Sequence, residues 1–262
     1  MRHPILITVA LDWEEAAISG GALLSMPHAS GVARLRQAQW GELSLWILRT
    51  GVGPERATGA TRWAIDIVRP RAVVSTGCAG ALLEGIGTGD VIVADEIVTA
   101  DGTTRPTNSR WSERYRQAAA SAGIGARRGR LFTSTEMLLG PGAKRAVAER
   151  TGAIAVDMEA AAVADCGHAA GTEVGVARVI LDPLDLSIPS ELPAVTTDSG
   201  RPSLARLLTA IAHRPRLAAD LIRVGASVPR CRAALATLHR ELRRGLLEDR
   251  EQPLPKRSRF AK

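Results

Sequence analysis

The chain has 262 residues, of which 45% are hydrophobic and only 3% aromatic, and its formal net charge is +7. Ala, Leu, Val and Ile can build a sizeable core in a chain of this length without disulfides or metal ions. The three cysteines form no CxxC pair and the five histidines are scattered, which indicates a reducing compartment and no metal site. No apolar run reaches the roughly 18 residues of a membrane-spanning helix, so we expect a cytoplasmic protein.

The charge is unevenly distributed along the chain. Residues 201–262 hold 15 Lys and Arg against 5 Asp and Glu, whereas residues 1–200 hold 19 against 22. The body is therefore mildly acidic and the C-terminal part strongly basic. We predict a catalytic domain over residues 1–200, a basic amphipathic helical extension over 201–250 and a disordered basic tail over 251–262.

Short apolar runs alternate with helical patterns along the first 182 residues. Such strands, apolar without alternation, predict an α/β fold of three layers, in which helices flank a mixed, mostly parallel central sheet. Strands are predicted at residues 5–11, 43–48, 72–75, 91–97, 131–133, 154–156 and 174–181, and helices at 12–18, at 54–68 and after Glu159.

Acids and glycines stand where several predicted strands end. Glu14 and Glu15 follow the first strand, a Gly-rich loop over 76–80 follows the third, and Asp182 ends the last. Because open α/β sheets bind ligands beyond the carboxyl ends of their strands, the pattern predicts a small-molecule site. Simpler explanations stand beside it: the two glutamates complement a helix dipole, the glycines serve tight turns, and Asp182 before Pro183 starts a turn.

The second half changes character after Asp182. Residues 183–202 are rich in Pro, Ser, Thr and Asp and are predicted to form a loop. Two Arg-rich amphipathic helices should follow. The first is predicted from Leu204 to Ile222, interrupted at Pro215, and the second from Val228 to Leu246.

Four segments together resemble a known family over residues 5–183. Their order and spacing are similar to those of the purine nucleoside phosphorylase / methylthioadenosine–S-adenosylhomocysteine nucleosidase family, and the DMEA segment and the R-x-x-x-D strand are the most specific. The segments are Ala10–Glu14 (ALDWE), Thr76–Gly80 (TGCAG), Ala155–Ala160 (AVDMEA) and Arg178–Asp182 (RVILD).

The resemblance implies a reaction and a role for each matched acid. Asp182 would protonate the leaving purine at N7, and Glu159 would accept hydrogen bonds from the ribose 2′ and 3′ hydroxyls. Glu14 would position an attacking water, and Met158 would pack under the sugar. Further binding residues implied by the resemblance are Val52, Cys78, Ala79 and Gly80 around the ribose and base, and Met137 and Leu138 beside the purine.

The sequence also departs from the family pattern. Cys78 stands where the nucleosidases usually have Ser, Asp157 replaces Glu, and the residues beside the purine are aliphatic. Arg49 and Arg56 flank a Gly-rich turn and could bind phosphate as a co-substrate, although surface arginines are the commoner reading. No cofactor is implied, and water is slightly favoured over phosphate as the nucleophile.

The basic C-terminal part, together with the Asp-Pro-Leu-Asp segment at 182–185, resembles the hopanoid-associated phosphorylases. That resemblance implies adenosylhopane as substrate, and contact of residues 201–250 with an anionic membrane on the cytoplasmic face of the inner membrane. A helical lid or dimer-packing element explains the same residues equally well. We expect deletion after Gly200 to spare turnover of a soluble nucleoside.

Two rival functions remain open at this point. One is a methylthioadenosine/S-adenosylhomocysteine nucleosidase, and the other is a non-catalytic membrane- or nucleic-acid-binding protein on the same scaffold. Nucleic acid is not the expected partner because no aromatic stacking platform accompanies the basic residues. The family resemblance further implies a homodimer.

Overall fold

The computed structural model describes residues 4–19, 22–27, 31–40, 43–189 and 217–251. The helix predicted over Leu204–Ile211, the break at Pro215 and the tail over 252–262 lie outside these residues. The described strands are β1 (Ile5–Val9), β2 (Ala22–Pro27), β3 (Arg34–Trp40), β4 (Leu43–Arg49), β5 (Ala72–Ser75), β6 (Cys78–Ala81), β7 (Val91–Val98), β8 (Thr104–Pro106), β9 (Ala126–Thr133), β10 (Ala153–Asp157) and β11 (Glu173–Asp182). The described helices are α1 (Asp12–Ile18), α2 (Pro54–Val68), α3 (Ser109–Ser121), α4 (Pro141–Thr151), α5 (Ala160–Ala169) and α8 (Leu217–Glu251).

The strands form one mixed sheet in the order β2-β3-β4-β1-β5-β11-β6-β10-β9-β7-β8. Its centre, from β4 through β1 and β5 to β11, is parallel, and β2 and β3 extend it antiparallel at one edge. Beyond β11 the sheet curls, because β7 pairs with β9 and also antiparallel with β11. The predicted fold class, a mixed central sheet flanked by helices, is confirmed.

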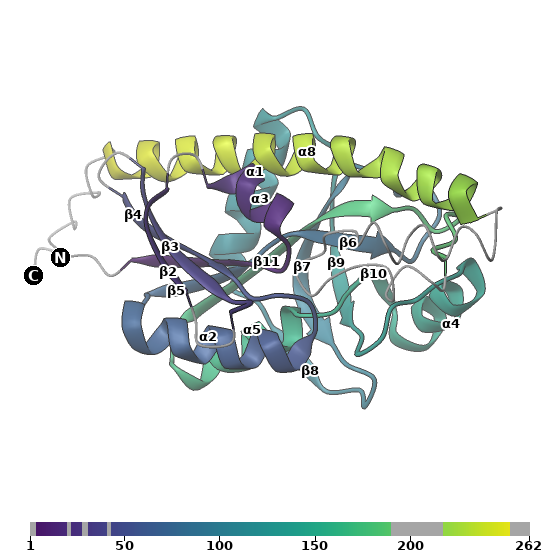
Figure 1. Cartoon of the computed structure of the whole chain (residues 1–262), viewed down its shortest axis with the longest axis horizontal. Coiled ribbons are helices and arrows are strands. Elements are labelled where there is room, and N and C mark those ends of the chain that lie inside the picture. Colours follow the sequence, from purple (N-terminus) through teal and green to yellow (C-terminus); the bar gives the residue numbers. More distant parts are fainter. Residues whose placement is uncertain (1–3, 20–21, 28–30, 41–42, 190–216, 252–262) are drawn as a thin grey trace, which may run out of the picture.

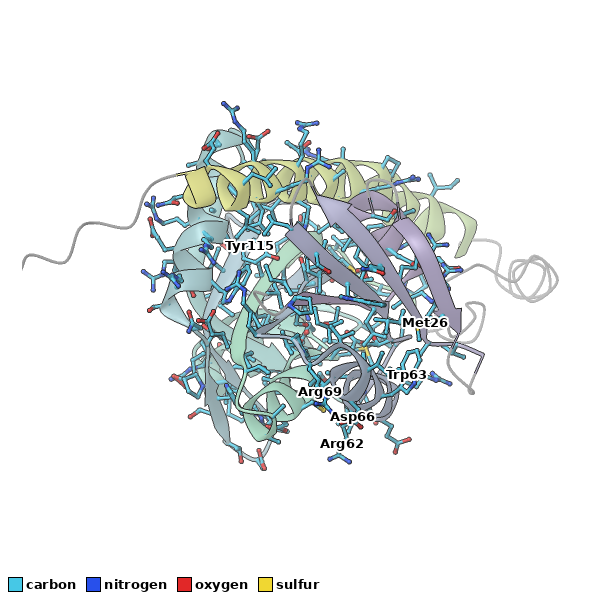
Figure 2. All side chains as sticks on the ribbon, turned by 90° about the vertical axis from the view of Figure 1, so that its left-hand side faces the viewer. Met26, Arg62, Trp63, Asp66, Arg69 and Tyr115 are labelled. Atoms are coloured by element: carbon cyan, nitrogen blue, oxygen red, sulfur yellow. The ribbon has the colours of Figure 1, made fainter. Side chains whose placement is uncertain are left out.

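Helices cover both faces of the sheet (Figure 1). Alternate residues of β1 explain how: Ile5 and Ile7 belong to the core cluster shared with α3 and α8, whereas Leu6 belongs to the cluster shared with α2 and α5. The outer side of α2 carries exposed Arg62 and Asp66 on the side opposite α8 (Figure 2). A strand buried on both faces needs apolar residues in succession, which is the pattern seen in the sequence.

The segment predicted as a Gly-rich loop over 76–80 is a strand from Cys78 onward. This strand, β6, pairs parallel with β11 through Cys78 and Ala79, and antiparallel with β10 through Gly80 and Ala81. Its side chains are short, so the sheet curls closely around it. The correction matters because it places three predicted site residues on a rigid element.

The C-terminal part differs most from its prediction. Residues 217–222 and 228–246 belong to one continuous helix, α8, which passes through Pro229. A proline inside a helix costs about 3 kcal/mol, but α8 buries Leu235, Leu238 and Leu242 almost completely. Burial of each such side chain contributes about 1.5–3 kcal/mol, which outweighs the break that the sequence suggested.

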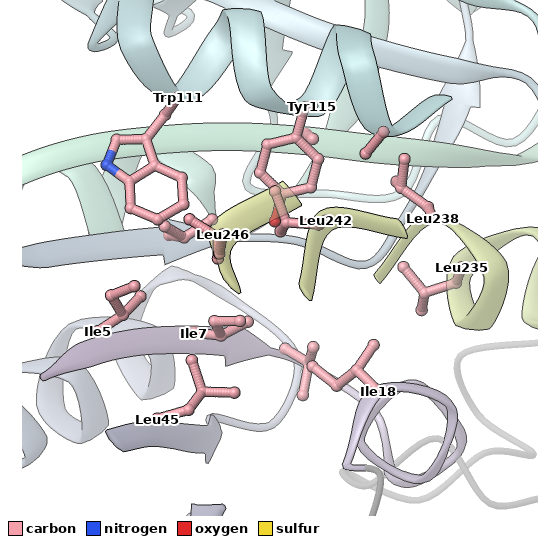
Figure 3. Close-up of a cluster of buried hydrophobic side chains, with 14 of the residues drawn as sticks. Ile5, Ile7, Ile18, Leu45, Trp111, Tyr115, Leu235, Leu238, Leu242 and Leu246 are labelled. Atoms are coloured by element: carbon pink, nitrogen blue, oxygen red, sulfur yellow. The ribbon is translucent and has the colours of Figure 1, made fainter. Parts of the chain in front are cut away.

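One face of α8 is part of the main core and not of a separate extension. Its leucines share a cluster with β1 and with Trp111 and Tyr115 of α3 (Figure 3). A chain cut after Gly200 loses this part of the core, so it is not expected to retain turnover, contrary to the expectation from the sequence. None of the described helices, α8 included, has the length and apolar content needed to cross a membrane.

Candidate active site

A cavity of about 850 Å³ opens beyond the carboxyl ends of β1, β4, β5, β10 and β11. Asp182, Glu159 and Glu14 all line it, although they are far apart in the sequence. The structure therefore brings the whole predicted set together at the edge of the sheet where open α/β folds bind ligands. The other predicted residues in its wall are Val52, Cys78, Ala79, Gly80, Met137, Leu138 and Met158.

Glu14 is buried at the start of α1 and is held by backbone donors. Its Oε2 accepts from the amides of Ala10 and Leu11, both at 2.9 Å, and its Oε1 accepts from the amide of Cys78 at 2.7 Å. The neighbouring Glu15 instead forms ion pairs with arginines of β3. The helix-dipole explanation is therefore insufficient for Glu14, whose carboxylate joins two loops at the cavity.

Asp182 is the last residue of β11 and only 6% exposed. Its Oδ2 lies 2.7 Å from the Nζ of Lys144 on α4, a lysine whose side chain is fully buried. Burial raises the pKa of the Asp182 carboxyl, and the ammonium of Lys144 opposes that rise. The result is a carboxyl that can hold a proton and still release it beside a cation.

Two glycines make room for these carboxylates. A Cβ at Gly80 would lie 2.7 Å from Asp182 Oδ2, and a Cβ at Gly77 would lie 2.8 Å from Glu14 Oε1. Gly77 also has φ +132°, a conformation that residues with a Cβ rarely adopt. The glycines of TGCAG are therefore needed for the close approach of the acids as well as for the turn.

Glu159 stands at the start of α5 and faces the Gly-rich turn before α2. Its Oε1 accepts from the amide of Gly53 at 2.8 Å. Burial, and next the nearby carboxylate of Asp157, raise the pKa of Glu159 to about 8. The free site therefore holds this carboxyl largely protonated near neutral pH, and hydroxyl donors would favour its ionised form.

A buried network lies beneath the DMEA segment. Arg178 of β11 donates to Asp157 Oδ2 from Nε at 3.1 Å and to Ser75 Oγ at 2.8 Å. Asp157 also accepts from Thr133 Oγ1 at 2.7 Å and from the amide of Ala160 at 2.8 Å. The R-x-x-x-D pattern thus has two tasks, because Arg178 supports the DMEA segment through Asp157 while Asp182 lines the cavity.

Cys78 contributes its backbone and not a reactive thiolate. Burial, and next the nearby Glu14 carboxylate, raise the pKa of the Cys78 thiol well above its ordinary value. A thiol is the weak nucleophile and the thiolate the strong one. The departure from Ser at this position therefore adds no covalent step.

The two arginines considered for phosphate lie in different places. Arg49 is buried, forms an ion pair with Asp12 and donates to the carbonyl of Val32, and it does not line the cavity. It is neither the surface residue nor the phosphate ligand considered from the sequence. Arg56 is exposed, lines the cavity and donates to the carbonyl of Val52.

One contributor was not found from the sequence. Lys144 was missed, although it shares a buried helical face with Val147 and Thr151, a pattern that marks it as a core position. Helix α8, for which the sequence left a helical lid open, forms part of the cavity wall through Val224 and Val228. The buried His239 of α8 also contacts Thr76 Oγ1 at 3.1 Å, directly before the Gly77 turn.

Comparison with known proteins agrees with this geometry. Residues 4–213 match the phosphorylase superfamily. The chain belongs to this family. A curated relative, the 5′-methylthioadenosine/S-adenosylhomocysteine nucleosidase of Actinobacillus succinogenes, is 27% identical over 67% of this chain and 84% of its own length.

Solved structures share the fold at lower identity. The Neisseria meningitidis 5′-methylthioadenosine/S-adenosylhomocysteine nucleosidase superposes with a TM-score of 0.72 at 18% identity, covering 92% of this chain and 98% of its own. The futalosine hydrolase of Helicobacter pylori gives 0.72 at 17% identity, covering 92% and 97%. With this family membership, the chain is an enzyme that cleaves a glycosidic bond.

Proposed function

We propose that the protein hydrolyses the N-glycosidic bond of an adenine nucleoside that carries a large apolar group at its 5′ position, as adenosylhopane does. The observation that carries the reaction is the placement of three carboxyls in one cavity with three different sets of partners. Asp182 has a buried cation, whereas Glu14 and Glu159 accept hydrogen bonds from backbone amides. This division supplies an acid for one end of the bond and acceptors for the other.

The chemistry assigns one step to each acid. As the C1′–N9 bond breaks, its electron pair moves to the purine and N7 takes the proton of Asp182. Glu159 accepts hydrogen bonds from the 2′ and 3′ hydroxyls while positive charge develops on the ribose. Water adds to C1′ and passes its proton to Glu14. Together these steps release adenine and a free sugar.

The partners of Glu14 support its role toward water. A carboxylate offers about four lone-pair sites. Three backbone amides use two sites on Oε2 and one on Oε1. The Cys78 thiol also hydrogen-bonds Glu14, so the attacking water competes with this weak donor for the remaining site.

The charges around the cavity favour water over phosphate. Glu14 and Asp157 line it, and a phosphate dianion beside these two carboxylates is repelled. Arg178 donates to Asp157, and Arg56 is exposed with its Nη1 on the carbonyl of Val52. Phosphate is therefore the less suitable nucleophile.

The α8 side of the cavity supports the apolar substituent. Val224 and Val228 of α8 line the cavity together with Leu11 and Trp13. Ile222, six residues before Val228 on the same helix, is 71% exposed. A cavity of about 850 Å³ lies in the upper part of the range for sites that enclose drug-sized ligands. We infer that the substituent leaves the cavity along α8.

A second candidate is 5′-methylthioadenosine/S-adenosylhomocysteine nucleosidase activity. It is favoured by the relative from Actinobacillus succinogenes, which carries that name and matches 67% of this chain. The same acids would perform the same steps. The two candidates differ only in the 5′ group of the nucleoside.

Adenine release from the two substrates decides between them. Purified protein is given adenosylhopane in vesicles or 5′-methylthioadenosine in buffer, each with and without phosphate, with Asp182→Asn as the blank. We expect the higher kcat/KM on the lipid-linked nucleoside and no requirement for phosphate. Turnover of methylthioadenosine alone would establish the second candidate, and strict dependence on phosphate would remove water as the nucleophile.

We further propose that the outer face of α8 contacts an anionic membrane. Arg232, Arg240 and Arg244 are exposed there, and each basic residue near such a surface contributes about 1 kcal/mol. Changing all three to Glu should abolish sedimentation with phosphatidylglycerol vesicles. Arg62→Glu on α2, which lies across the sheet (Figure 2), should leave it unchanged. Equal binding by both variants would contradict the proposal.

The homodimer implied by the family resemblance stays a prediction. Light scattering of the purified chain at working concentration tests it directly.

A further inference from the structure

Lys144 has surroundings that its place in the sequence does not explain. Its side chain is fully buried, and its Nζ lies 2.7 Å from Asp182 Oδ2, 2.8 Å from the carbonyl of Pro183 and 3.4 Å from that of Leu186. An ammonium has three donors, so these three acceptors satisfy it. Burying a cation is costly unless it is paired, and among the described residues its charged partner is the acid that the proposed function assigns to the leaving purine.

The position of Lys144 excludes direct contact with substrate. Among the described residues that line the cavity, Lys144 is absent, whereas Asp182 and Gly80 are present. The ammonium approaches Oδ2, and the missing Cβ of Gly80 leaves space at the same oxygen. The ammonium contact holds the carboxyl through Oδ2, and we assign the proton to Oδ1.

We propose that Lys144 is a positioning residue for the general acid, which orients the Asp182 carboxyl toward the purine and stabilises the carboxylate that forms when its proton leaves. The inference rests on the proposed function. As the C1′–N9 bond breaks, its electron pair goes to the purine and N7 takes the Asp182 proton. Lys144 keeps all three of its own protons throughout, and water and Glu14 act at C1′ as before.

Helix α4, which carries Lys144, is connected to the other residues predicted to contact the purine. Helix α4 follows directly on the segment that carries Met137 and Leu138, which line the cavity. The amide of Ile188 donates to the carbonyl of Leu139 at 2.7 Å, which ties the turn after Asp182 to that segment. The acid, its cation and the residues predicted to flank the purine therefore belong to one connected unit.

A purely structural role for Lys144 predicts a different set of results. If the lysine only tied α4 to the turn at 183–186, its loss would lower stability and leave the pH dependence of the reaction unchanged. A cation at 2.7 Å from a carboxyl instead changes that dependence. An opposite charge at such a distance moves a carboxyl pKa by about 1–3 units. The pH profile therefore separates the two roles.

Lys144→Met is the direct test. Burial raises the pKa of Asp182 and Lys144 lowers it, so loss of the cation raises the pKa further. Asp182 then stays protonated to higher pH, and the alkaline limb of the kcat profile should move up by about 1–3 pH units. Because the carboxylate is no longer stabilised, kcat at the optimum should fall roughly 10–100-fold, with KM nearly unchanged.

Other titratable or charged groups lie near Asp182, and the Lys144 substitution must leave them unchanged if the pH profile is to report on Asp182. The Cys231 thiol on α8 lies close enough to be affected by the Asp182 charge, and its pKa is raised mainly by burial. The other carboxyl groups and the guanidinium groups in the cavity wall are unchanged by the substitution. These groups are Glu14, Glu136, Asp157, Glu159, Arg56 and Arg178.

Two further variants keep the test decisive. Arg145→Ala, at the next position of α4, removes an exposed arginine paired with Glu84 and should alter neither kcat nor the profile. Lys144→Ala with added ethylammonium should regain activity and the original alkaline limb. If neither Lys144 variant folds, the Asp182 carboxyl signal of the wild-type enzyme is followed by carbon-13 NMR. A carboxyl that titrates while the Lys144 ammonium stays charged supports the pair, and an ammonium that loses its proton in the active pH range overturns it.

The outcomes distinguish this inference from the proposed function. If the wild-type enzyme releases no adenine from any nucleoside, the proposed function fails. If the wild type is active and Asp182→Asn is inactive, but Lys144→Met keeps the wild-type profile and amine does not rescue Lys144→Ala, only the role of Lys144 fails.

Discussion

The two ends of the cavity hold their carboxyls by different means. At the end that the proposed function assigns to the base, Asp182 Oδ2 lies 2.7 Å from an ammonium, whereas at the end it assigns to the ribose Glu14 and Glu159 accept from neutral backbone amides. A charged partner makes a carboxyl a stronger acid, and amide donors fix the direction in which a carboxylate accepts. The proposed function uses this difference for proton donation at one end and hydrogen-bond acceptance at the other.

The largest effect should come from removing the acid at the base end. Asp182→Asn keeps the shape of the side chain but cannot donate a carboxyl proton, so we expect kcat to fall by roughly 10³-fold, within the range for general acids. Adenine release measured at saturating substrate checks this. Asp185→Asn, an exposed neighbour, is the control. If Asp182→Asn keeps more than about a tenth of the activity, the assignment of the base end is wrong.

The ribose end should respond to the substrate as well as to the mutation. Glu159→Gln should lower kcat/KM for ribonucleosides by roughly 10²-fold but hardly affect 2′,3′-dideoxy analogues. The reason is that the substitution weakens hydrogen bonds that only a substrate with 2′ and 3′ hydroxyls can make. Parallel kinetics on the two substrate classes measure the difference. Glu149→Gln on the exposed side of α4 should change neither. Equal losses on both classes would remove Glu159 from the ribose.

A substitution that adds only a methyl group beside Asp182 should affect the end of the cavity that holds this acid. In Gly80→Ala the new Cβ would lie 2.7 Å from Asp182 Oδ2, so the acid must move. A misplacement of about 1 Å can cost up to 10²-fold in rate, and we expect a loss of roughly 10–100-fold in kcat with the fold retained. Gly59→Ala on α2, where a Cβ meets nothing within 4 Å, should keep full activity. Wild-type kcat in Gly80→Ala would mean that the acid does not need its observed position.

The smallest expected effect is the pH dependence of binding at the ribose end. The pKa of Glu159 is raised to about 8, so below that pH the carboxyl must lose its proton before it can accept from two hydroxyls. KM for a ribonucleoside should therefore fall about fivefold as the pH rises from 7 to 8, and level off above about pH 9. Glu159→Gln should give a flat KM over this range. A KM that rises with pH in the wild type would contradict the raised pKa.

The sequence predicted the elements with simple periodicity and the acids at their ends. The helices at 12–18 and 54–68 and the strand at 72–75 have the predicted bounds. The strand at Cys78 was missed because a run of small residues with glycines is typical of a turn, and the strands that pair with it are distant in the sequence. Lys144 was missed because a lysine is expected at the surface unless it has an anionic partner. That partner, Asp182, lies 38 positions away in the sequence.

The continuity of α8 was hidden for a similar reason. Pro229 marks a break by local rules, and only the packing of Leu235, Leu238 and Leu242 against the body outweighs it. Tertiary contacts between distant segments thus explain all three errors. The charge of the C-terminal part pointed to an external partner, whereas its leucines belong to the core.

The packing of α8 also sets the order in which the protein can mature on the ribosome. Ile5 and Ile7 are synthesised well before Leu242 and Leu246, yet all four belong to the same cluster. A nascent chain held before residue 231 exposes that face of β1, together with Trp111 and Tyr115 of α3. Such exposed apolar surface makes a nascent chain prone to aggregation, so biosynthesis of this enzyme should depend on chaperones until α8 emerges.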